Sequence, residues 1–269
     1  MKVYKPSDLV AYLNKLGTHA KKSFSQNFLI DKNIIDRIVS DADVSSGDVV
    51  LEIGPGPGAL TDALLETGAT VYAVEKDPLF AQGLRERAHP NLHVIEDDFL
   101  KTPLPNHLGI KVVANLPYNI TTPIFEKLFE NHSSILSMTV MVQKEFADRI
   151  VASKNTKAYG SLTLFVELYA DVVTRFIVSP NCFYPPPKVT SSVVTLKINR
   201  KTVQSDPSCI IRHCFTKRRK MLRVCLKDLY ARENIEQAFA ALPFTETLRP
   251  ENLSLTEFDM LATALQSGK

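Results

Sequence analysis

Apolar and polar residues follow two different spacings along the chain, one typical of strands and one of helices. Short β-branched runs predict buried strands at 49–53, 70–74, 92–95, 112–114 and 138–142. Apolar residues at helical spacing predict helices over 31–44 and 59–66, and further helices that start near Pro78 and Thr121. This alternation predicts an α/β fold built on a Rossmann-like, doubly wound parallel sheet.

The pattern changes after Asn199, where helical segments follow one another without intervening strands. Helices are predicted at 207–215, 221–230, 235–242 and 255–265. The last of them begins with a Ser254-x-x-Glu257 capping box. We therefore expect two domains, 1–199 and 200–269, the second small and helical.

Composition places the chain among ordinary globular proteins, since 45% of its 269 residues are hydrophobic and 23% are charged. No apolar run is long enough to cross a membrane, and the first 22 residues, which include Asp8, resemble neither a signal peptide nor a transit peptide. The four cysteines form no C-x-x-C pair and have no matching histidines, so no metal site is predicted. We expect a cytoplasmic protein with reduced cysteines.

Charge is divided unevenly along the chain. Residues 48–98 contain ten acidic and three basic residues, whereas residues 212–227 contain seven basic residues and no acidic one. An all-basic run gains nothing from acid–base pairs one helical turn apart and repels itself, so a phosphate-bearing partner is favoured over a merely solvated helix face. The residues predicted to bind nucleic acid here are Lys217, Arg218, Arg219, Lys220 and Arg223.

A glycine-rich turn follows the strand at 49–53. Gly54, Gly56 and Ala59 fit the dinucleotide pattern G-x-G-x-x-G/A, so a nicotinamide cofactor stays open. However, two prolines in the turn remove backbone N–H groups that a pyrophosphate would need. A ligand with a carboxylate, an amine and a sulfonium needs fewer such donors. A tight turn without any ligand is the simpler alternative, but it does not require three glycines.

Acidic residues follow the next two strands. Glu75 lies 21 positions after Gly54 at the tip of the neighbouring strand, where ribose hydroxyls are held in such folds. Glu96-Asp97-Asp98-Phe99 follows the third strand. A carboxylate in this run, such as Asp98, can accept from an adenine amino group while Phe99 covers the ring. A solvated turn explains the run equally well.

The stretch Asn115-Leu116-Pro117-Tyr118 ends an apolar run abruptly. Pro117 fixes its own φ and has no N–H, so the strand must end at the carboxyl edge of the sheet, where ligands bind. The Asn115 oxygen and the Leu116 carbonyl can accept the N–H groups of an aromatic amine and orient its lone pair, while Tyr118 stacks on the base. The alternative is a strand end in which Asn115 bonds to its own backbone and Tyr118 is packed.

Phe183-Tyr184-Pro185-Pro186-Pro187-Lys188-Val189 predicts a stiff, extended segment with two aromatic rings and a cation. Phe183 and Lys188 are candidates for contact with a nucleic-acid base and backbone. Packing of this segment against the core is an equally good explanation.

These motifs, in this order, resemble those of the ribosomal RNA adenine N6-dimethyltransferase family, and especially of its bacterial small-subunit members. The matching stretches are Gln26-Asn27-Phe28-Leu29, Glu52 to Gly58, Glu75, Asp98, Asn115 to Tyr118, Phe183 to Val189 and Arg218-Arg219-Lys220. The resemblance spans nearly the whole chain. One departure is Ser25, where the family usually has glycine.

The resemblance implies a class I methyltransferase that uses S-adenosylmethionine to dimethylate two adjacent adenosines near the 3′ end of small-subunit (16S) rRNA. Its substrate would be an immature ribosomal particle, and we expect a monomer. The implied cofactor contacts come from Asn27, Leu29, Gly54, Gly56, Glu75, Asp98 and Asn115. The implied catalytic residues are Asn115, Leu116, Pro117 and Tyr118.

Two other functions share these motifs. A large-subunit (23S) rRNA adenine methyltransferase conferring antibiotic resistance has the same catalytic residues, and only the helical tail and the Pro-Pro-Pro-Lys segment favour the small-subunit function. A ribosome-assembly or transcription factor on the same fold would have lost catalysis. The intact Asn115, Pro117 and Tyr118 argue against that second alternative.

Overall fold

The structure is a computed structural model that describes residues 2–20 and 26–266. Ser25, the departure from the family pattern, lies outside the described residues. The chain divides into two compact units. Unit 1 comprises Met1–Ala147 and Val172–Ile198, and unit 2 comprises Asp148–Asp171 and Asn199–Lys269.

The predicted strands and helices occur in the predicted order, and further elements that were not predicted, with short 3₁₀ helices (η), lie before and between them. The first half of the chain forms α1 (Pro6–Lys15), β1 (Phe28–Leu29), α2 (Lys32–Asp41), β2 (Val49–Ile53), α3 (Ala59–Glu66), β3 (Thr70–Glu75), α4 (Pro78–Arg85), β4 (Leu92–Glu96), β5 (Ile110–Asn115), η2 (Tyr118–Ile120), α5 (Thr121–Glu130) and η3 (His132–Ser134). The second half forms β6 (Ile135–Gln143), α6 (Lys144–Ile150), α7 (Ser161–Tyr169), β7 (Ala170–Val178), η4 (Pro180–Cys182), β8 (Phe183–Tyr184), β9 (Ser191–Ile198), α8 (Ser208–Thr216), α9 (Leu222–Leu226), α10 (Arg232–Ala241), η5 (Pro250–Asn252) and α11 (Leu255–Gln266).

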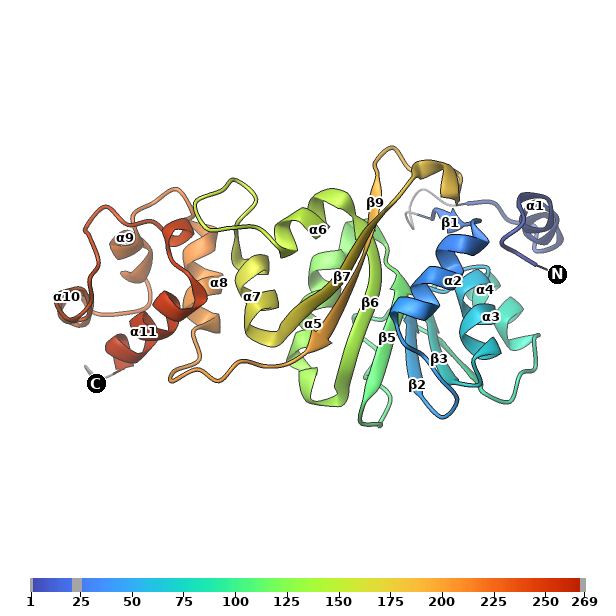
Figure 1. Ribbon diagram of the computed structural model, residues 1–269, viewed down its shortest axis with the longest axis horizontal. Helices are drawn as coiled ribbons and strands as arrows, with labels where there is room; N and C mark the ends of the chain where they lie inside the picture. Colours follow the sequence, from blue (N-terminus) through green and yellow to red (C-terminus); the bar gives the residue numbers. More distant parts are fainter. Residues whose placement is uncertain (1, 21–25, 267–269) are drawn as a thin grey trace. The chain divides into compact units, whose positions relative to one another are not determined.

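A seven-stranded sheet of order β4-β3-β2-β5-β6-β9-β7 organises unit 1. Strands β4, β3, β2, β5 and β6 pair in parallel. Figure 1 shows helices on both faces of the sheet, with α2 and α3 on the near face and α5 behind the strands. The doubly wound fold predicted from the sequence is thus confirmed. Strand β9, however, runs antiparallel to β6.

Helix α2 shows why the elements form where they do. The Asp31 side chain caps it by accepting from the N–H groups of Asn33 at 2.9 Å and Ile34 at 3.2 Å. The helical spacing then places Ile35 and Ile38 in the core that unit 1 builds between the sheet and its helices. The helix ends at Asp41, earlier than its apolar pattern predicts.

A second, two-stranded sheet joins segments far apart in the sequence. Strand β1 pairs antiparallel with β8, and the register sets Phe28 opposite Tyr184 and Leu29 opposite Phe183. Helix α1 packs on this region through a cluster that contains Leu9 and Phe28. Each strand is only two residues long, so no periodic pattern in the sequence predicts them.

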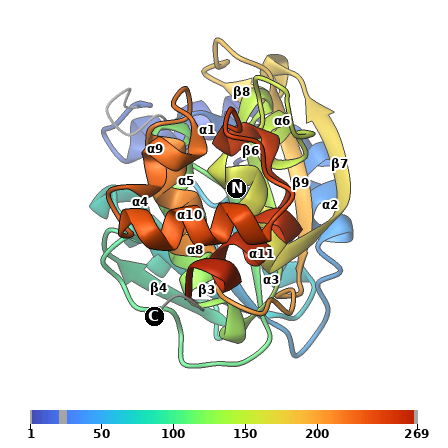
Figure 2. The same cartoon turned by 90° about the vertical axis from the view of Figure 1, so that its left-hand side faces the viewer.

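Unit 2 consists of helices α7 to α11 with their connections. Helix α11 contacts both α8 and α10, which an end-on view shows (Figure 2). The loop after α6 is tied to this unit, because Tyr159 Oη donates to the Leu253 carbonyl at 2.6 Å and Asn155 N–H donates to the Glu251 carbonyl at 3.0 Å. These contacts explain why residues 148–171 belong to unit 2, although the sequence pattern places them before the expected boundary.

Candidate active site

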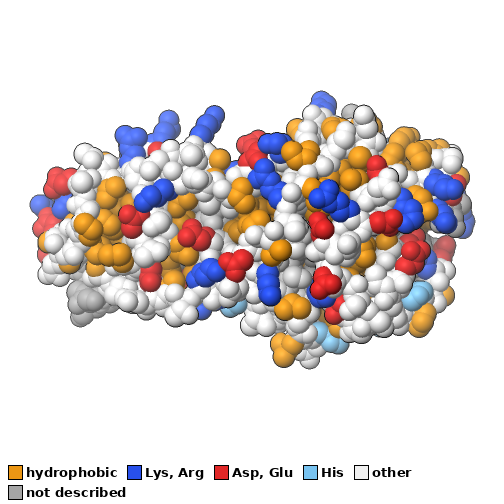
Figure 3. Space-filling view, viewed as in Figure 1, with side chains coloured by type: hydrophobic (Ala, Val, Ile, Leu, Met, Phe, Trp, Pro, Cys, Tyr) orange, Lys and Arg blue, Asp and Glu red, His pale blue; other side chains and the backbone are white. Residues whose placement is uncertain are grey.

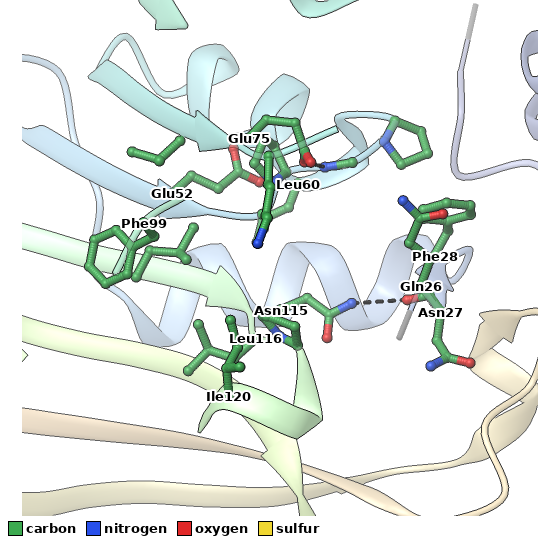
Figure 4. A pocket seen from close by; sticks show the side chains of 18 of the residues that line it. Gln26, Asn27, Phe28, Glu52, Leu60, Glu75, Phe99, Asn115, Leu116 and Ile120 are labelled. Carbon is green, nitrogen blue, oxygen red and sulfur yellow. Dashed lines mark hydrogen bonds between the residues drawn. The ribbon is translucent and has the colours of Figure 1, made fainter. Parts of the chain in front are cut away.

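A cavity of about 260 Å³ opens at the carboxyl ends of β2, β3 and β5 in unit 1 (Figure 4). Residues proposed from the sequence as cofactor-binding or catalytic are brought together in its lining: Asn27, Leu29, Gly54, Gly56, Glu75, Asp98, Asn115, Leu116, Pro117 and Tyr118. Phe99 and Phe28 lie at opposite ends of the cavity, with Leu60 and Asn115 between them (Figure 4).

The glycine-rich turn is shaped by neighbours on two sides. Gly56 has a φ of +55°, and a Cβ atom there would lie 3.2 Å from Phe28 Cε1. Gly58 has a φ of +89°, and a Cβ atom there would lie 2.5 Å from the Arg87 guanidinium nitrogens. Arg87 Nη2 donates to the Pro57 carbonyl at 2.7 Å. Glycine is therefore required at both positions, and Arg87 holds the turn although nothing near it in the sequence indicates this contact.

Glu75 ends β3 and is only 6% exposed. Its Oε2 accepts from the Gly56 N–H at 2.8 Å, and its Oε1 accepts from the Asp77 N–H at 2.7 Å. Burial raises the pKa of this carboxyl, whereas the backbone N–H groups of Asp77, Gly56 and Lys76 favour its charged form. An ionised carboxylate has about four acceptor sites. Glu75 is therefore fixed in orientation and can still accept a hydroxyl.

Glu52 is an acidic residue of the cavity to which the sequence alone assigns no role. It is 1% exposed, and its Oε2 has no hydrogen-bond partner within the described part of the chain. Burial raises the pKa of Glu52 to about 8. A cationic ligand group would supply the partner that this carboxyl lacks. The signal in the sequence is a charged residue inside the apolar run 49–53.

The acidic run after β4 divides between the cavity and the surface. Asp97 and Asp98 line the cavity, and Asp98 Oδ2 lies 2.9 Å from Lys76 Nζ. This ammonium lowers the pKa of Asp98. Glu96 instead pairs with Arg85 at 2.7 Å on the surface. Of the three carboxylates, two remain in position to meet a ligand.

Asn115 ends β5 beside the cavity. Its Nδ2 donates to the Asn27 carbonyl oxygen at 3.1 Å, drawn as a dashed line in Figure 4. The Leu116 N–H donates to the Met141 carbonyl at 3.0 Å and extends the ladder with β6. The amide is thus bonded to a distant backbone group rather than to its own.

Tyr118 is anchored at its hydroxyl, which lies 2.6 Å from Ser191 Oγ on β9. Burial raises the pKa of this phenol. The Pro117 carbonyl accepts from Thr121 Oγ1 at 3.1 Å, which fastens the start of α5 to the corner. The corner therefore presents an amide, a rigid proline and a fixed aromatic ring to the cavity.

Comparison with known proteins identifies the family to which this site belongs. A family model described as ribosomal RNA adenine dimethylase matches residues 17–262. A protein from Protochlamydia amoebophila named ribosomal RNA small subunit methyltransferase A is 43% identical, over 100% of this chain and 99% of that protein. The chain belongs to the ribosomal RNA adenine dimethylase family. A protein of the same name from Chlamydia caviae is 44% identical over 98% of each chain.

Solved structures agree with this family. A dimethyladenosine transferase from Plasmodium falciparum superposes with a TM-score of 0.74 at 28% identity, covering 89% of this chain and 98% of that one. The 23S rRNA methyltransferase ErmE gives a TM-score of 0.66 at 28% identity, covering 89% of this chain and 100% of that one. This rRNA adenine dimethylase is an S-adenosylmethionine-dependent enzyme. Membership of this family therefore excludes the nicotinamide cofactor that the glycine pattern also allows, in favour of S-adenosylmethionine.

In this dimethylase, the two residues of the Pro-rich segment predicted to contact RNA, Phe183 and Lys188, differ in their exposure to solvent. Phe183 is 2% exposed, and its side chain belongs to the core of unit 1. Lys188 is exposed, as is the neighbouring Tyr184, whose side chain is 39% exposed. Contact between Phe183 and RNA stays a prediction that requires the ring to leave the core. Tyr184 is the accessible aromatic of this segment.

The basic run of the dimethylase, in unit 2, is partly neutralised by acids that lie elsewhere in the sequence. Lys217 pairs with Asp228, and Arg223 Nη1 lies 2.9 Å from Glu246. Arg218 Nε lies 2.5 Å from Glu251 Oε2, and its Nη1 and Nη2 donate to the carbonyls of residues 157 and 156 at 2.7 and 2.9 Å. These three residues therefore have partners within the protein, but the pairs of Lys217 and Arg223 are exposed to solvent and weak, so contact of all three with RNA stays a prediction.

Arg219 and Lys220 differ from their neighbours. Both are exposed, and neither side chain has a hydrogen bond or ion pair with any described residue. Figure 3 shows Lys and Arg side chains projecting together over the segment that joins α8 to α9. These two cations can meet phosphates without giving up a partner within the described residues.

Proposed function

We propose that this rRNA adenine dimethylase transfers methyl groups from S-adenosylmethionine to two adjacent adenosines in the 3′-terminal hairpin of small-subunit rRNA. The observation that carries the proposal is the Asn115 amide, which is bonded through Nδ2 at the edge of the same cavity that contains Glu75 and Phe99. The names of the relatives support the small subunit over the large one.

The residues of the cavity fit the cofactor group by group. Glu75 is oriented to accept from the ribose, because its backbone N–H contacts fix the carboxylate and leave acceptor capacity on it. Glu52 offers a buried acceptor without a partner in the described chain, which suits an ammonium. Phe99 and Asp98 suit the adenine ring and its amino group. When bound, the cofactor supplies an electrophilic methyl group on a sulfonium.

Asn115 is proposed to orient the substrate. A carbonyl oxygen can only accept, so the Asn27 carbonyl fixes Nδ2 on its side and leaves Oδ1 to accept an N–H of the target adenine. With the Leu116 carbonyl as second acceptor, the amine nitrogen becomes more tetrahedral and its lone pair is freed from the ring. Tyr118 then stacks on the base, which must leave its own stack to enter. The methylated amine is acidic enough to lose its proton to water.

The proposed substrate is rRNA within an immature small-subunit particle, and we propose that the chain acts in the cytoplasm as a monomer. The cavity is lined by unit 1 of one chain, so no second copy is needed to complete it. No helix among residues 2–20 and 26–266 is long and apolar enough to cross a membrane.

The test uses ribosomal particles from a strain that lacks this enzyme. The purified protein should transfer labelled methyl groups to immature small subunits, and primer extension should stop at two adjacent adenosines near the 3′ end. Asn115→Ala protein serves as the inactive control. Modification of large-subunit RNA instead would contradict the proposal. Comparing naked rRNA, immature particles and mature subunits identifies the substrate form, and light scattering gives the oligomeric state.

A further inference from the structure

Lys127 is a half-buried cation that the proposed catalytic steps do not use. It lies on α5, the helix that follows the Asn115–Ile120 corner. Its Nζ donates to the Phe99 carbonyl at 2.6 Å and to the Thr102 carbonyl, and it lies 4.9 Å from the centroid of the Phe99 ring. An ammonium has three N–H groups, and the two carbonyls take two of them. Lys127 thus binds one turn of backbone rather than an acid.

The turn that Lys127 holds is the wall of the cavity that bears Asp98 and Phe99. Within it, Asp98 Oδ1 accepts from the Leu100 N–H at 3.0 Å, and the Asp98 carbonyl accepts from Thr102 Oγ1 at 3.0 Å. These local bonds shape the turn but do not attach it to another element. Lys127 supplies that attachment from α5, through two backbone carbonyls.

Lys127 connects two parts of the reaction site, the corner with Asn115 and the turn with Phe99. Helix α5 starts at the corner that carries Asn115 and Tyr118, and Lys127 connects the same helix to the turn with Phe99. Lys76 also binds this turn, but it is exposed and touches only the Asp98 carboxylate. It therefore does not replace the contacts that Lys127 makes to the backbone carbonyls of Phe99 and Thr102.

We propose that Lys127 is a positioning residue that sets the adenine subsite of the cofactor by fixing the Asp98–Thr102 turn against α5. The inference rests on the proposed function, which places the cofactor's adenine beside Asp98 and Phe99. Without the ammonium, two buried carbonyls lose their donor and the Phe99 ring loses the cation beside it. The turn is then no longer fixed against α5, and the adenine amino group loses its acceptor. Contacts to the other parts of the cofactor should be less affected.

The test compares Lys127→Met with Lys101→Met, which removes an exposed lysine of the same turn. Calorimetry measures the affinity of each protein for S-adenosylhomocysteine and for S-inosylhomocysteine, which lacks the adenine amino group. Lys127→Met should lower the affinity for S-adenosylhomocysteine about tenfold. It should also reduce the preference of the protein for S-adenosylhomocysteine over the inosyl analogue. KM for S-adenosylmethionine should rise, while kcat and KM for the RNA particle stay within about twofold. Lys101→Met should match wild type.

Other results would distinguish a failure of the proposed function from a failure of the proposed role of Lys127. If wild type binds neither analogue, the proposed function fails rather than the role of Lys127. If Lys127→Met binds both analogues like wild type, or loses both equally, the positioning role is contradicted. Lys127→Arg covers the case in which Lys127→Met does not fold, because guanidinium can donate to both carbonyls. It should keep the adenosyl preference, and losing that preference completely would also contradict the inference.

Discussion

The Asn115 side-chain Nδ2 donates a hydrogen bond to the Asn27 backbone carbonyl oxygen at 3.1 Å, across 88 positions of sequence. This bond decides which end of the amide faces the cavity, because only the nitrogen can donate to a carbonyl. Asn27 immediately precedes β1, which β8 holds by antiparallel pairing. The amino-terminal segment that resembles a cofactor motif therefore also orients the residue proposed to bind the substrate amine.

Asn115→Ala should lower the single-turnover methylation rate by about 10²–10³-fold, by analogy with the loss of one preorganised transition-state hydrogen bond. Cofactor affinity should fall much less. Asn115→Asp should also be slow, because a carboxylate oxygen would face the Asn27 carbonyl without a proton between them and would stabilise the sulfonium of the ground state. Rapid-quench assays paired with cofactor titrations measure both effects. A near-wild-type rate for Asn115→Ala would end the proposed role.

Glu75→Ala should weaken cofactor binding by about 1.5–3 kcal/mol, the cost of losing hydrogen bonds to a charged group. The structure adds a second consequence, since the Gly56 and Asp77 N–H groups lose their acceptor. Glu75→Gln should not rescue binding, because its NH₂ would meet one of those donors. Calorimetric titration of S-adenosylhomocysteine measures both variants. Unchanged affinity in Glu75→Ala would dismiss Glu75 as the ribose ligand.

Much of the sheet could be predicted because each strand is an apolar run that ends at a turn. The run at 112–114 stops at Pro117, and the strand ends at Asn115. Because parallel strands share one carboxyl edge, residues such as Glu75 could be grouped with Asn115 on the sequence pattern alone. The capping box of α11 is equally local, since Glu257 Oε2 accepts from the Ser254 N–H at 2.7 Å and Ser254 Oγ accepts from the Glu257 N–H at 3.3 Å.

What the sequence could not show depends on contacts between distant segments. The β1–β8 pair is too short to leave a period, so the core position of Phe183 has no local signal. The basic run seemed unpaired because the window around it contains no acid, yet Glu251 meets Arg218 from 33 positions away. Lys127 has the sequence context of an ordinary helical lysine, and only the fold brings it to the turn that it holds.

Glu52→Gln should change how stability depends on pH. The pKa of Glu52 is raised to about 8 by burial, against an ordinary value of 4.5. The folded state therefore favours the protonated form, and this contribution to stability is present below the ordinary pKa and is lost as pH rises through about 8. Glutamine stays neutral throughout. The variant should gain stability relative to wild type as pH rises from about 5 to about 8, by on the order of 5 kcal/mol at most. Urea unfolding at each pH, without cofactor, measures this difference. A free energy of unfolding that changes with pH in the same way in both proteins would contradict the prediction.

Replacing Arg218 should lower the stability of the protein, whereas replacing its neighbours Arg219 and Lys220 should weaken RNA binding. Arg218 donates to Glu251 and to two carbonyls of the loop after α6, so Arg218→Ala should loosen unit 2. We expect its melting temperature to fall by on the order of 5 °C. Differential scanning calorimetry measures the change. A variant as stable as wild type would show that the contacts to Glu251 and the loop contribute nothing.

Arg219→Ala/Lys220→Ala should instead leave the melting temperature unchanged and weaken RNA binding, because neither side chain has a partner within the described residues. Each lost phosphate contact should reduce the log–log dependence of affinity on salt by roughly 0.7–0.9. Cofactor affinity should not change. Lys101→Ala/Lys197→Ala is the matched control, since it removes the same charge from exposed positions of unit 1. Filter binding of small-subunit particles at several salt concentrations measures the slopes. If both double variants bind with the wild-type slope, Arg219 and Lys220 are merely solvated and do not contact the RNA.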